Sequence, residues 1–460
     1  MRKPLVLILI LNLGIILPAS AHSNADDFIT NIKSSITSGI KYLSDTQVKE
    51  TQNIEKFKGE WACYEEVDKS TPRIGKAGYS AYDSNLFTTA TIHNSLAEIY
   101  LINPKLKEIP RMLALAMENI NLYKNEDKDI PQYNFWQKLP IPTNLLGRGE
   151  TVEDYPYLRR GNHFFLQGKF VWHASNVQDD ADDTSLAFAA YKLNQEILGK
   201  NSFNSPQWMD ENISYVFDNW RDKNRTNRNI YNVLFGGMRE TGAFLTWLGP
   251  EGSFPGHHLL PFREQYIPFG ANDVDCVVNT NVLGTLALFE EQQVSEGYEK
   301  SCKFVNNKII KKQHRKCGVY YPNAYNFYYT AMRAVHSGAE CLEESVPTIS
   351  TEILKHQAAN GSWDTDGKDK IQSTAYALGS LVNIKNPSEK IILAIEKGLK
   401  YLLSVSVKDE ESGHISWEGG IFFSGGRVFR DRVSFRSTPY TTSLIIEVMT
   451  KYLFLKDALS

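Results

Sequence analysis

Four aspartates, Asp179, Asp180, Asp182 and Asp183, stand close together directly before Thr184 and an apolar run. If this cluster is buried, its carboxyl groups cannot all ionise, because burial and neighbouring negative charges both raise a carboxyl pKa. At least one group then stays protonated near neutral pH, and an acid held away from water is suited to protonate an alkene or an epoxide. The alternative is capping, since acidic groups at a helix N-terminus gain ~0.3–1 kcal/mol each without any catalysis.

A second acidic site consists of Asp273 and Asp275, directly before Cys276. It opens a helix near Asn279 and occupies the same position in a repeated unit as the first cluster, so we expect both sites at one mouth of the fold. Helix capping explains the pair as well as binding does. As a binding site it would hold a polar or diphosphate head group of a substrate through a metal, although two carboxylates are few for a metal site.

Two further candidates for substrate contact are Trp172 and His173, shortly before the first cluster. An indole face attracts a cation, so Trp172 is suited to stabilise a carbocation, and His173 is placed to hydrogen-bond the acid. Two long segments rich in proline, glycine and aromatic residues, 124–170 and 222–275, are predicted to form lids over the mouth.

The helices that must position these groups follow a repeat. A threonine followed by a small residue opens an apolar run six times, at Thr89, Thr184, Thr280, Thr330, Thr374 and Thr442. The runs are apolar around most of the helix, which indicates burial on nearly all sides. Asp183, Asn279, Ser373 and the threonines are the predicted N-cap residues of these helices.

A segment with a narrower apolar stripe precedes each buried helix. Residues 29–43 carry isoleucines and a leucine at steps of three and four, and residues 205–220 begin with a serine cap and a first-turn proline. Six half-exposed helices that alternate with six buried ones favour an outer ring around an inner ring. The predicted fold class is therefore all-α, a single (α/α)6 toroid with two lid-like insertions.

Two short motifs resemble those of the terpenoid cyclase and protein prenyltransferase superfamily, which uses this toroid. Gln357, Gly361 and Trp363 match the Q-x-x-x-G-x-W repeat of squalene and related triterpene cyclases, and residues 180–184 match the D-x-D-D-T motif of class II terpene cyclases. The resemblance implies that Asp182 is the proton donor and that Asp180 and Asp183 tune and orient it. It further implies an isomerase or lyase acting on a hydrophobic, isoprenoid-type small molecule.

The protein prenyltransferase branch of that superfamily is not expected here. Its zinc set includes an Asp-x-Cys pair and a His-Thr before an inner helix, whereas Asp275 and Cys276 are adjacent and Ser373 stands where the histidine belongs. Without that nitrogen ligand, a thiolate-activating zinc site is not expected. We predict no cofactor, with Mg²⁺ as an addition only if a diphosphate substrate is bound.

The N-terminus has the pattern of a secretory signal peptide, with Arg2 and Lys3 before an apolar stretch and a small-x-small site at residues 19–21. Cleavage is predicted near Ala21, which leaves residues 22–460 as one periplasmic or secreted domain without a transmembrane span. The formal net charge of −3 and the lack of a basic stripe argue against nucleic acid, and no protein partner is indicated. An oxidising compartment allows one or two disulfides, with the pairing open, among Cys63, Cys276, Cys302, Cys317 and Cys341.

Two other functions fit the sequence. One is a carbohydrate-active toroid, a lyase or hydrolase, whose arginines, histidines and tyrosines would line a polar cleft. Hydrolysis of this kind needs two carboxyl groups ~5–9 Å apart. The other is a non-catalytic toroid that binds a lipid, a peptide or a protein, with every acid satisfied by capping and ion pairs.

Overall fold

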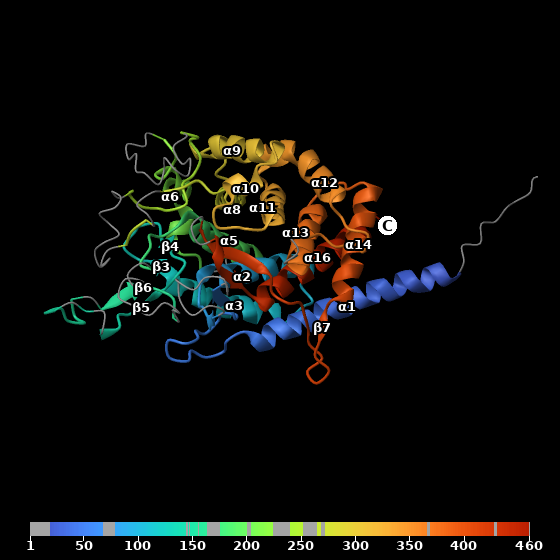
Figure 1. The fold of residues 1–460 in the computed structure, drawn as a ribbon, viewed down its shortest axis with the longest axis horizontal. Helices are drawn as coiled ribbons and strands as arrows, with labels where there is room; N and C mark the ends of the chain where they lie inside the picture. Colours follow the sequence, from blue (N-terminus) through green and yellow to red (C-terminus); the bar gives the residue numbers. More distant parts are fainter. Residues whose placement is uncertain are drawn as a thin grey trace, which may run out of the picture.

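The computed structural model describes residues 19–67, 79–143, 146, 148–154, 156–162, 175–199, 204–223, 240–251, 265–267, 272–365, 369–426 and 430–459. Within these residues, six helices close into an inner ring. Each packs against the next, and the last packs against the first (Figure 1). In ring order they are α2 (Leu86–Ile102), α5 (Ala181–Leu198), α8 (Cys276–Leu288), α11 (Ala324–His336), α13 (Lys370–Val382) and α16 (Thr438–Leu459). The predicted all-α toroid is confirmed.

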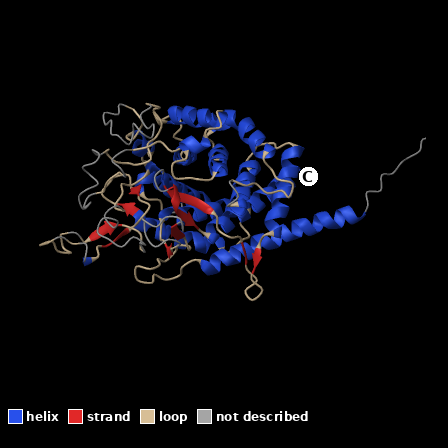
Figure 2. Cartoon of the chain, viewed as in Figure 1, coloured by secondary structure: helices blue, strands red, loops and turns tan. Residues whose placement is uncertain are grey.

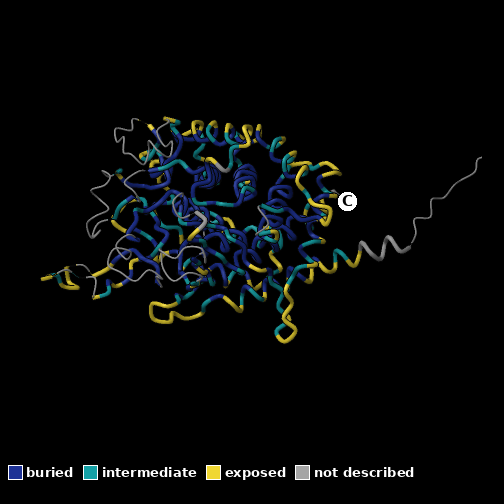
Figure 3. The backbone as a smooth tube through the Cα atoms, viewed as in Figure 1, coloured by how far each residue is buried: buried dark blue, intermediate teal, exposed yellow. Residues whose placement is uncertain are grey.

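An outer layer of helices covers this ring, with exposed residues on its outward side (Figure 3). α3 packs on α2, α9 on α8, α14 on α13 and α1 on α16. The outer helices are α1 (Ala19–Thr46), α3 (Ile109–Ile120), α9 (Tyr298–Ile310), α12 (Val346–Lys355) and α14 (Glu389–Ser404), and the short connecting helices are η1 (Asn121–Tyr123), α10 (His314–Cys317) and η6 (Glu340–Ser345). The narrow apolar stripes of the sequence are the faces that these helices bury.

The helix predicted over residues 205–220 is wrong. The chain forms two short helices instead, η3 (Gln207–Asp210) and α6 (Ser214–Asp218). The Glu291 carboxylate accepts hydrogen bonds from the backbone N–H groups of Ile213, at 3.0 Å, and Ser214, at 2.7 Å. This long-range contact satisfies the N–H groups that a continuous helix would pair within itself, so a new helix starts at this point.

The predicted N-caps are also wrong, by about one turn. The N-caps of α5, α8 and α13 are Asp180, Asp275 and Asp369 rather than Asp183, Asn279 and Ser373. The residues one turn later accept hydrogen bonds from the preceding loop. Tyr133 N donates to Thr184 Oγ1, and Trp363 N and Trp417 N donate to the corresponding Thr374 and Thr442. The repeated threonines therefore attach loops to the inner helices.

Three tryptophans connect the two layers in the same way. The Nε1–H groups of Trp61, Trp363 and Trp417 donate to carbonyls in the last turns of α1, α12 and α14, at 2.8, 2.7 and 2.7 Å. All three indoles are buried. Each carbonyl also accepts a backbone N–H at the end of its helix, so the indole adds a second hydrogen bond that ties the tryptophan to the outer helix.

A four-stranded antiparallel sheet, in the order β2-β1-β10-β9, was not predicted (Figure 2). It joins the loop before α2 to the loop before α16, and its strands are β1 (Tyr64–Val67), β2 (Ser80–Tyr82), β9 (Ile421–Gly425) and β10 (Arg430–Arg436). Its register aligns Ala81, Glu65, Phe435 and Phe423 in one row across the strands. All but Phe423 are buried, so this row faces the interior.

The two long insertions meet at the N-terminal end of α5. In the first lie the hairpins of β3 (Lys124–Asn125) with β4 (Gln132–Tyr133) and of β5 (Lys138–Pro140) with β6 (Tyr157–Arg159), whereas β7 (Val407–Lys408) and β8 (Ile415–Ser416) form a hairpin elsewhere. Asp180 N donates to Tyr133 O of the first insertion, and Ala181 N donates to Thr246 O of the second. The described parts of both insertions thus contact the start of the helix that carries the acidic cluster.

Two disulfides pair four of the five cysteines. Cys276–Cys317 joins α8 to α10, and Cys302–Cys341 joins α9 to η6, whereas Cys63 is a free, buried thiol.

Candidate acid site at the start of helix α5

The acidic cluster lies at the N-terminal end of inner helix α5, and its four aspartates are all buried. Asp180 caps the helix, since its Oδ1 accepts the backbone N–H of Asp183 at 2.8 Å. Asp179 holds the first insertion, accepting the amides of Asn125 at 2.9 Å and Asn134 at 3.2 Å. Capping therefore explains Asp180 in part, while Asp182 and Asp183 follow within the first turn.

Asp180 and Asp183 are neighbouring buried carboxyl groups, and both favour the protonated form. Burial is the main cause that raises the pKa of Asp180 to about 8, and the charges of Asp182 and Asp179 add to it. Burial and the charge of Asp180 raise the pKa of Asp183 well above its usual range. The hydrogen bond between the two side chains lowers the pKa of Asp180 and raises that of Asp183, so Asp183 holds its proton more tightly than Asp180 does.

Asp182 points away from that pair, toward helix α8 and the loop before α11. Its Oδ1 accepts the amide of Asn281 at 2.6 Å, and its Oδ2 is hydrogen-bonded to the Tyr321 hydroxyl. Burial raises the pKa of Asp182, and these two hydrogen bonds oppose the rise. The pKa of Tyr321 lies well above its usual range, through burial and then the charge of Asp182, so the phenol stays protonated. Asp182 is thus a buried acid whose carboxylate form has two donors ready to stabilise it.

An aromatic cluster adjoins Asp182 through Tyr321. Its members come from α2, α16, the sheet and two loops, and are Phe87, Phe135, Tyr320, Tyr321, Phe422, Phe423, Phe435 and Tyr440. The ring centroid of Tyr321 lies 5.8 Å from that of Phe87 and 5.6 Å from that of Phe423. Ring faces carry negative electrostatic potential, so this cluster is suited to lie beside a carbocation.

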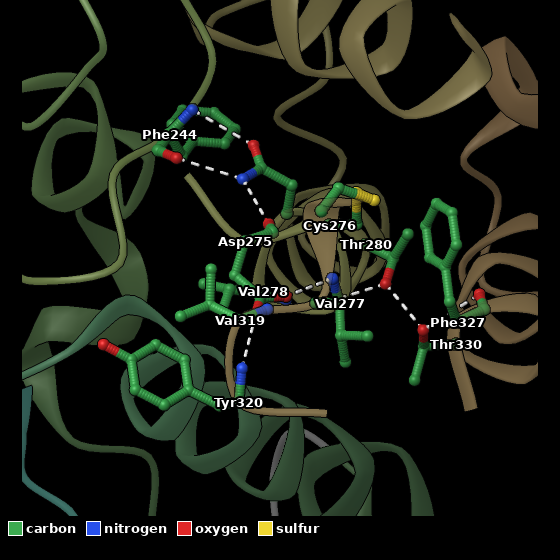
Figure 4. The surroundings of a disulfide bond; sticks show 12 residues. Phe244, Asp275, Cys276, Val277, Val278, Thr280, Val319, Tyr320, Phe327 and Thr330 are labelled. Carbon is green, nitrogen blue, oxygen red and sulfur yellow. Dashed lines mark hydrogen bonds between the residues drawn. A yellow bond between two sulfur atoms is a disulfide. The ribbon is translucent and has the colours of Figure 1, made fainter. Parts of the chain in front are cut away.

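The second acidic site lies at the same end of the ring, as expected from the repeat. Asp275 caps α8 by accepting Val277 N, and its other oxygen accepts Val319 N at 2.5 Å and Tyr320 N at 3.1 Å (Figure 4). Burial, with the charge of Asp273, raises the pKa of Asp275 to about 7 despite these bonds. Asp273 accepts the hydroxyls of Thr246 at 2.6 Å and Tyr320 at 2.9 Å. The bonds of Asp275 are those of a structural cap that fixes the loop carrying Tyr321.

Trp172 and His173, the other predicted contact residues, lie outside the described residues. Among the described residues, no group of three or more histidines, cysteines or acids is placed to hold a metal ion. None of the described helices combines the length and the apolar character needed to cross a membrane.

At the opposite end of the inner ring, buried charges pair with one another. Lys451 of α16 lies 2.8 Å from Glu447 and 3.5 Å from Glu98 of α2, and Tyr329 of α11 donates to Glu447 at 3.4 Å. The N-terminal end of the ring is therefore acidic and aromatic, and the other end carries ion pairs.

Three buried acids near the start of α2 were missed by the sequence analysis. They are Glu60, Glu65 and Asp83, each at most 3% exposed. Asp83 stands two residues before Asn85, the N-cap of α2, so its place before an inner helix was a usable signal. Glu65 gave none, because its burial depends on pairing with β10, some 370 residues away.

No protein-family model matches the sequence, and no curated protein sequence matches it significantly. The structure is similar to those of two variants of the type II terpene cyclase MstE from Scytonema, each in complex with its substrate, geranylgeranyl dihydroxybenzoate. The TM-scores are 0.52 and 0.50 at 12% and 11% sequence identity, and the matches cover 93% of this chain and 98% and 99% of the MstE chains. At this identity the similarity establishes the fold, which is the toroid of the terpenoid cyclases.

Proposed function

We propose that this chain is an exported, terpenoid cyclase-like enzyme in which Asp182 protonates a hydrophobic, isoprenoid-type substrate. One observation carries the proposal. The buried carboxyl of Asp182 is turned from its acidic neighbours toward Tyr321, which lies within ring contact of the aromatic cluster. An acid and a set of ring faces thus lie side by side in a site from which most water is excluded.

In the proposed reaction, the Asp182 O–H bond breaks and its proton forms a new C–H bond with one carbon of an alkene. The other alkene carbon becomes a cation, which a second alkene of the same substrate attacks to close a ring. The Asp182 carboxylate left behind accepts hydrogen bonds from Asn281 and Tyr321, which lowers the free energy of the charged product. The aromatic cluster stabilises the cation.

Asp180 and Asp183 orient Asp182. Asp180 caps α5 through the backbone N–H of Asp183, so the first helical turn, which carries Asp182, is fixed in place. Oδ1 of Asp183 is buried and has no hydrogen-bond partner among the described residues. Buried oxygens are usually hydrogen-bonded, so a role in helix capping alone does not account for Asp183. Trp172, His173 and Asp273 remain the proposed substrate contacts from the lids and the second acidic site, whereas Asp275, whose oxygens both accept backbone N–H groups, positions the loop of Tyr321.

Proton transfer of this kind needs no cofactor, and we propose none, with Mg²⁺ required only by a diphosphate-bearing substrate. The substrate of MstE, a geranylgeranyl chain on a dihydroxybenzoate, makes a prenylated aromatic acid a rational first probe. Periplasmic or secreted location after cleavage near Ala21 is supported by the two disulfides, which persist in oxidising compartments.

No specific observation favours the two other functions. A glycosidase needs two carboxyl groups facing each other ~5–9 Å apart across the sugar. Here Asp180, Asp182 and Asp183 share one helix end, and the side of Asp182 away from them meets aromatic rings.

The test uses the purified mature chain with geranylgeranyl dihydroxybenzoate, geranylgeranyl diphosphate and squalene as probes, in D₂O buffer, with products identified by mass spectrometry. We expect at least one probe to yield an isomer that carries one deuterium from solvent. Asp182→Asn keeps the size and the acceptor for Asn281, so it should abolish turnover without a change in melting temperature. The matched control is Asp210→Asn, at an exposed residue of η3, which should behave as wild type. Turnover by folded Asp182→Asn at the wild-type rate would refute the assignment.

A further inference from the structure

A second group of buried carboxyls faces the aromatic cluster from the side of the sheet. Glu65 lies in the inward row of the sheet, directly opposite Phe435 on β10, and Phe435 is in turn opposite Phe423 on β9. Residues directly opposite on antiparallel strands point to the same face, so the Glu65 side chain lies beside Phe435. Two strand spacings place Glu65 about 10 Å from Phe423, which contacts Tyr321.

Asp83 joins the same group from the loop between β2 and α2. Its Oδ1 accepts the indole N–H of Trp136 at 3.1 Å, and its Oδ2 accepts the amide of Asn85 at 2.9 Å. Trp136 stacks edge-on against Phe135, with ring centroids 5.0 Å apart, and Phe135 lies 5.2 Å from Phe423. Asp83 is therefore fixed by two donors at the border of the aromatic cluster.

Glu65 has no such partners. Its Oε2 is buried and has no hydrogen-bond donor among the described residues, and its whole side chain is 3% exposed. Burial and then the charge of Asp83 raise the pKa of Glu65 well above its usual range, while the two donors hold the pKa of Asp83 near 6 against burial. Near neutral pH the pair thus holds one proton, on Glu65, and one negative charge, on Asp83.

This arrangement is costly for a purely structural element. A buried, unpartnered carboxyl oxygen destabilises a fold, and an apolar residue would suit the row of Ala81, Phe435 and Phe423 better. A net negative pair next to ring faces is suited to a cation that forms among those rings.

We propose that the Glu65–Asp83 pair is a second proton-transfer site of the reaction, the one that accepts the proton released by the carbocation. The inference rests on the proposed function. Asp182 supplies one proton to the alkene, and later a C–H bond next to the final cationic carbon breaks. The electrons of that bond form a new C=C bond, and the proton passes to the Glu65–Asp83 pair. Substrate and product therefore have the same composition, and solvent restores both acid sites.

The test compares wild type with Asp83→Asn and Glu65→Gln, with Glu66→Gln as the matched control. Glu66 is next to Glu65 on β1 but faces outward, where it pairs with Arg436 at 2.9 Å. The probes are again geranylgeranyl dihydroxybenzoate, geranylgeranyl diphosphate and squalene in D₂O. In Asp83→Asn we expect the substrate still to take up one deuterium, while formation of the wild-type alkene falls roughly 10²-fold and water-captured alcohols appear. Glu65→Gln leaves the Asp83 carboxylate in place and should lose less of the wild-type alkene.

The outcomes separate the two proposals. If wild type consumes no probe, the proposed function fails and this inference fails with it. If wild type turns over and Asp83→Asn makes the same alkene at the same rate, only the inference is refuted. As a second measurement, infrared difference spectra of wild type against Glu65→Gln at neutral pH should show loss of a protonated carboxyl band. Loss of a carboxylate band instead would also overturn the inference.

Discussion

Acidification from about pH 8 to about pH 6.5 should stabilise this protein, opposite to the usual behaviour of carboxyl groups in salt bridges. Burial raises the pKa of Asp275 to about 7 and that of Glu60 to about 7, in the latter case against hydrogen bonds from Phe57, Tyr82 and Ser84. In the unfolded chain these carboxyls are ionised throughout this interval. The folded state alone takes up protons as the pH falls, so protonation favours folding.

The size of the effect follows from linkage. A carboxyl with a folded pKa near 7 contributes about 0.8 kcal/mol to the free energy of unfolding between about pH 8 and pH 6.5. Asp275 and Glu60 together contribute roughly twice that, and Asp180, with its pKa near 8, adds in the same direction. Burial lowers the pKa of His93 to about 4, and the protonation of this residue in the unfolded state offsets about 0.4 kcal/mol. The net gain exceeds about 1 kcal/mol.

Calorimetry at constant ionic strength measures this gain as a rise in melting temperature of at least about 1 °C, given the unfolding entropy of a chain of this length. Glu60→Gln keeps the side chain neutral at both pH values, so this variant should lose about 0.8 kcal/mol of the difference. Exposed Glu118→Gln serves as the control. A melting temperature that stays constant or falls on acidification, or a Glu60→Gln variant with the full wild-type difference, would refute the reasoning.

Three further predictions concern the scaffold. Trp363→Phe removes the indole donor of the Ile353 carbonyl, which keeps the backbone N–H of His356, and should lower the free energy of unfolding by about 0.5–1.5 kcal/mol in urea titrations; an unchanged free energy of unfolding would contradict this role of the indole. Replacement of both Cys302 and Cys341 by serine opens a loop of 39 residues and should lower the free energy of unfolding by roughly 3–4 kcal/mol. Because the variant lacks this disulfide, reductant should cause no further loss from it. Lys451→Met leaves buried Glu447 without its lysine partner, whereas half-buried Glu98 keeps His336 at 3.5 Å, and the variant should cost about 3–5 kcal/mol at neutral pH by thermal unfolding.

The inner ring could be predicted from the sequence because its signal is local. Helices that are apolar on all sides, such as the run after Thr184 or the run after Thr442, must be buried on all sides, and six of them in alternation with striped helices leave few arrangements. The helix over residues 205–220 failed for the opposite reason. Its break depends on Glu291, far away in the sequence, which no local pattern reveals.

The start of each inner helix was misplaced because two polar residues one turn apart compete for the N-cap. In α5, both Asp180 and Asp183 are good caps by residue type. The tertiary contacts decide, since the threonine that follows is already engaged by the loop N–H of Tyr133 and so belongs within the first turn. This shift has a chemical consequence, because it places Asp182 and Asp183 on the helix rather than before it.

The acid groups of the site differ in how far the sequence could reveal them. The aspartates of α5 are close together in the chain, so their crowding is visible before any folding. Glu65 and Asp83 come together through the pairing of β1 with β2. Glu65 reaches the aromatic cluster only when β1 pairs with β10, which joins the loop before α2 to the loop before α16 and also closes the ring. The closing contact of the toroid thus brings Glu65 beside Phe435, and with it the second carboxyl pair to the aromatic cluster. Any change that weakens the pairing of β1 with β10 should therefore disturb the proposed proton acceptor before it disturbs Asp182, whose partners Asn281 and Tyr321 come from other elements.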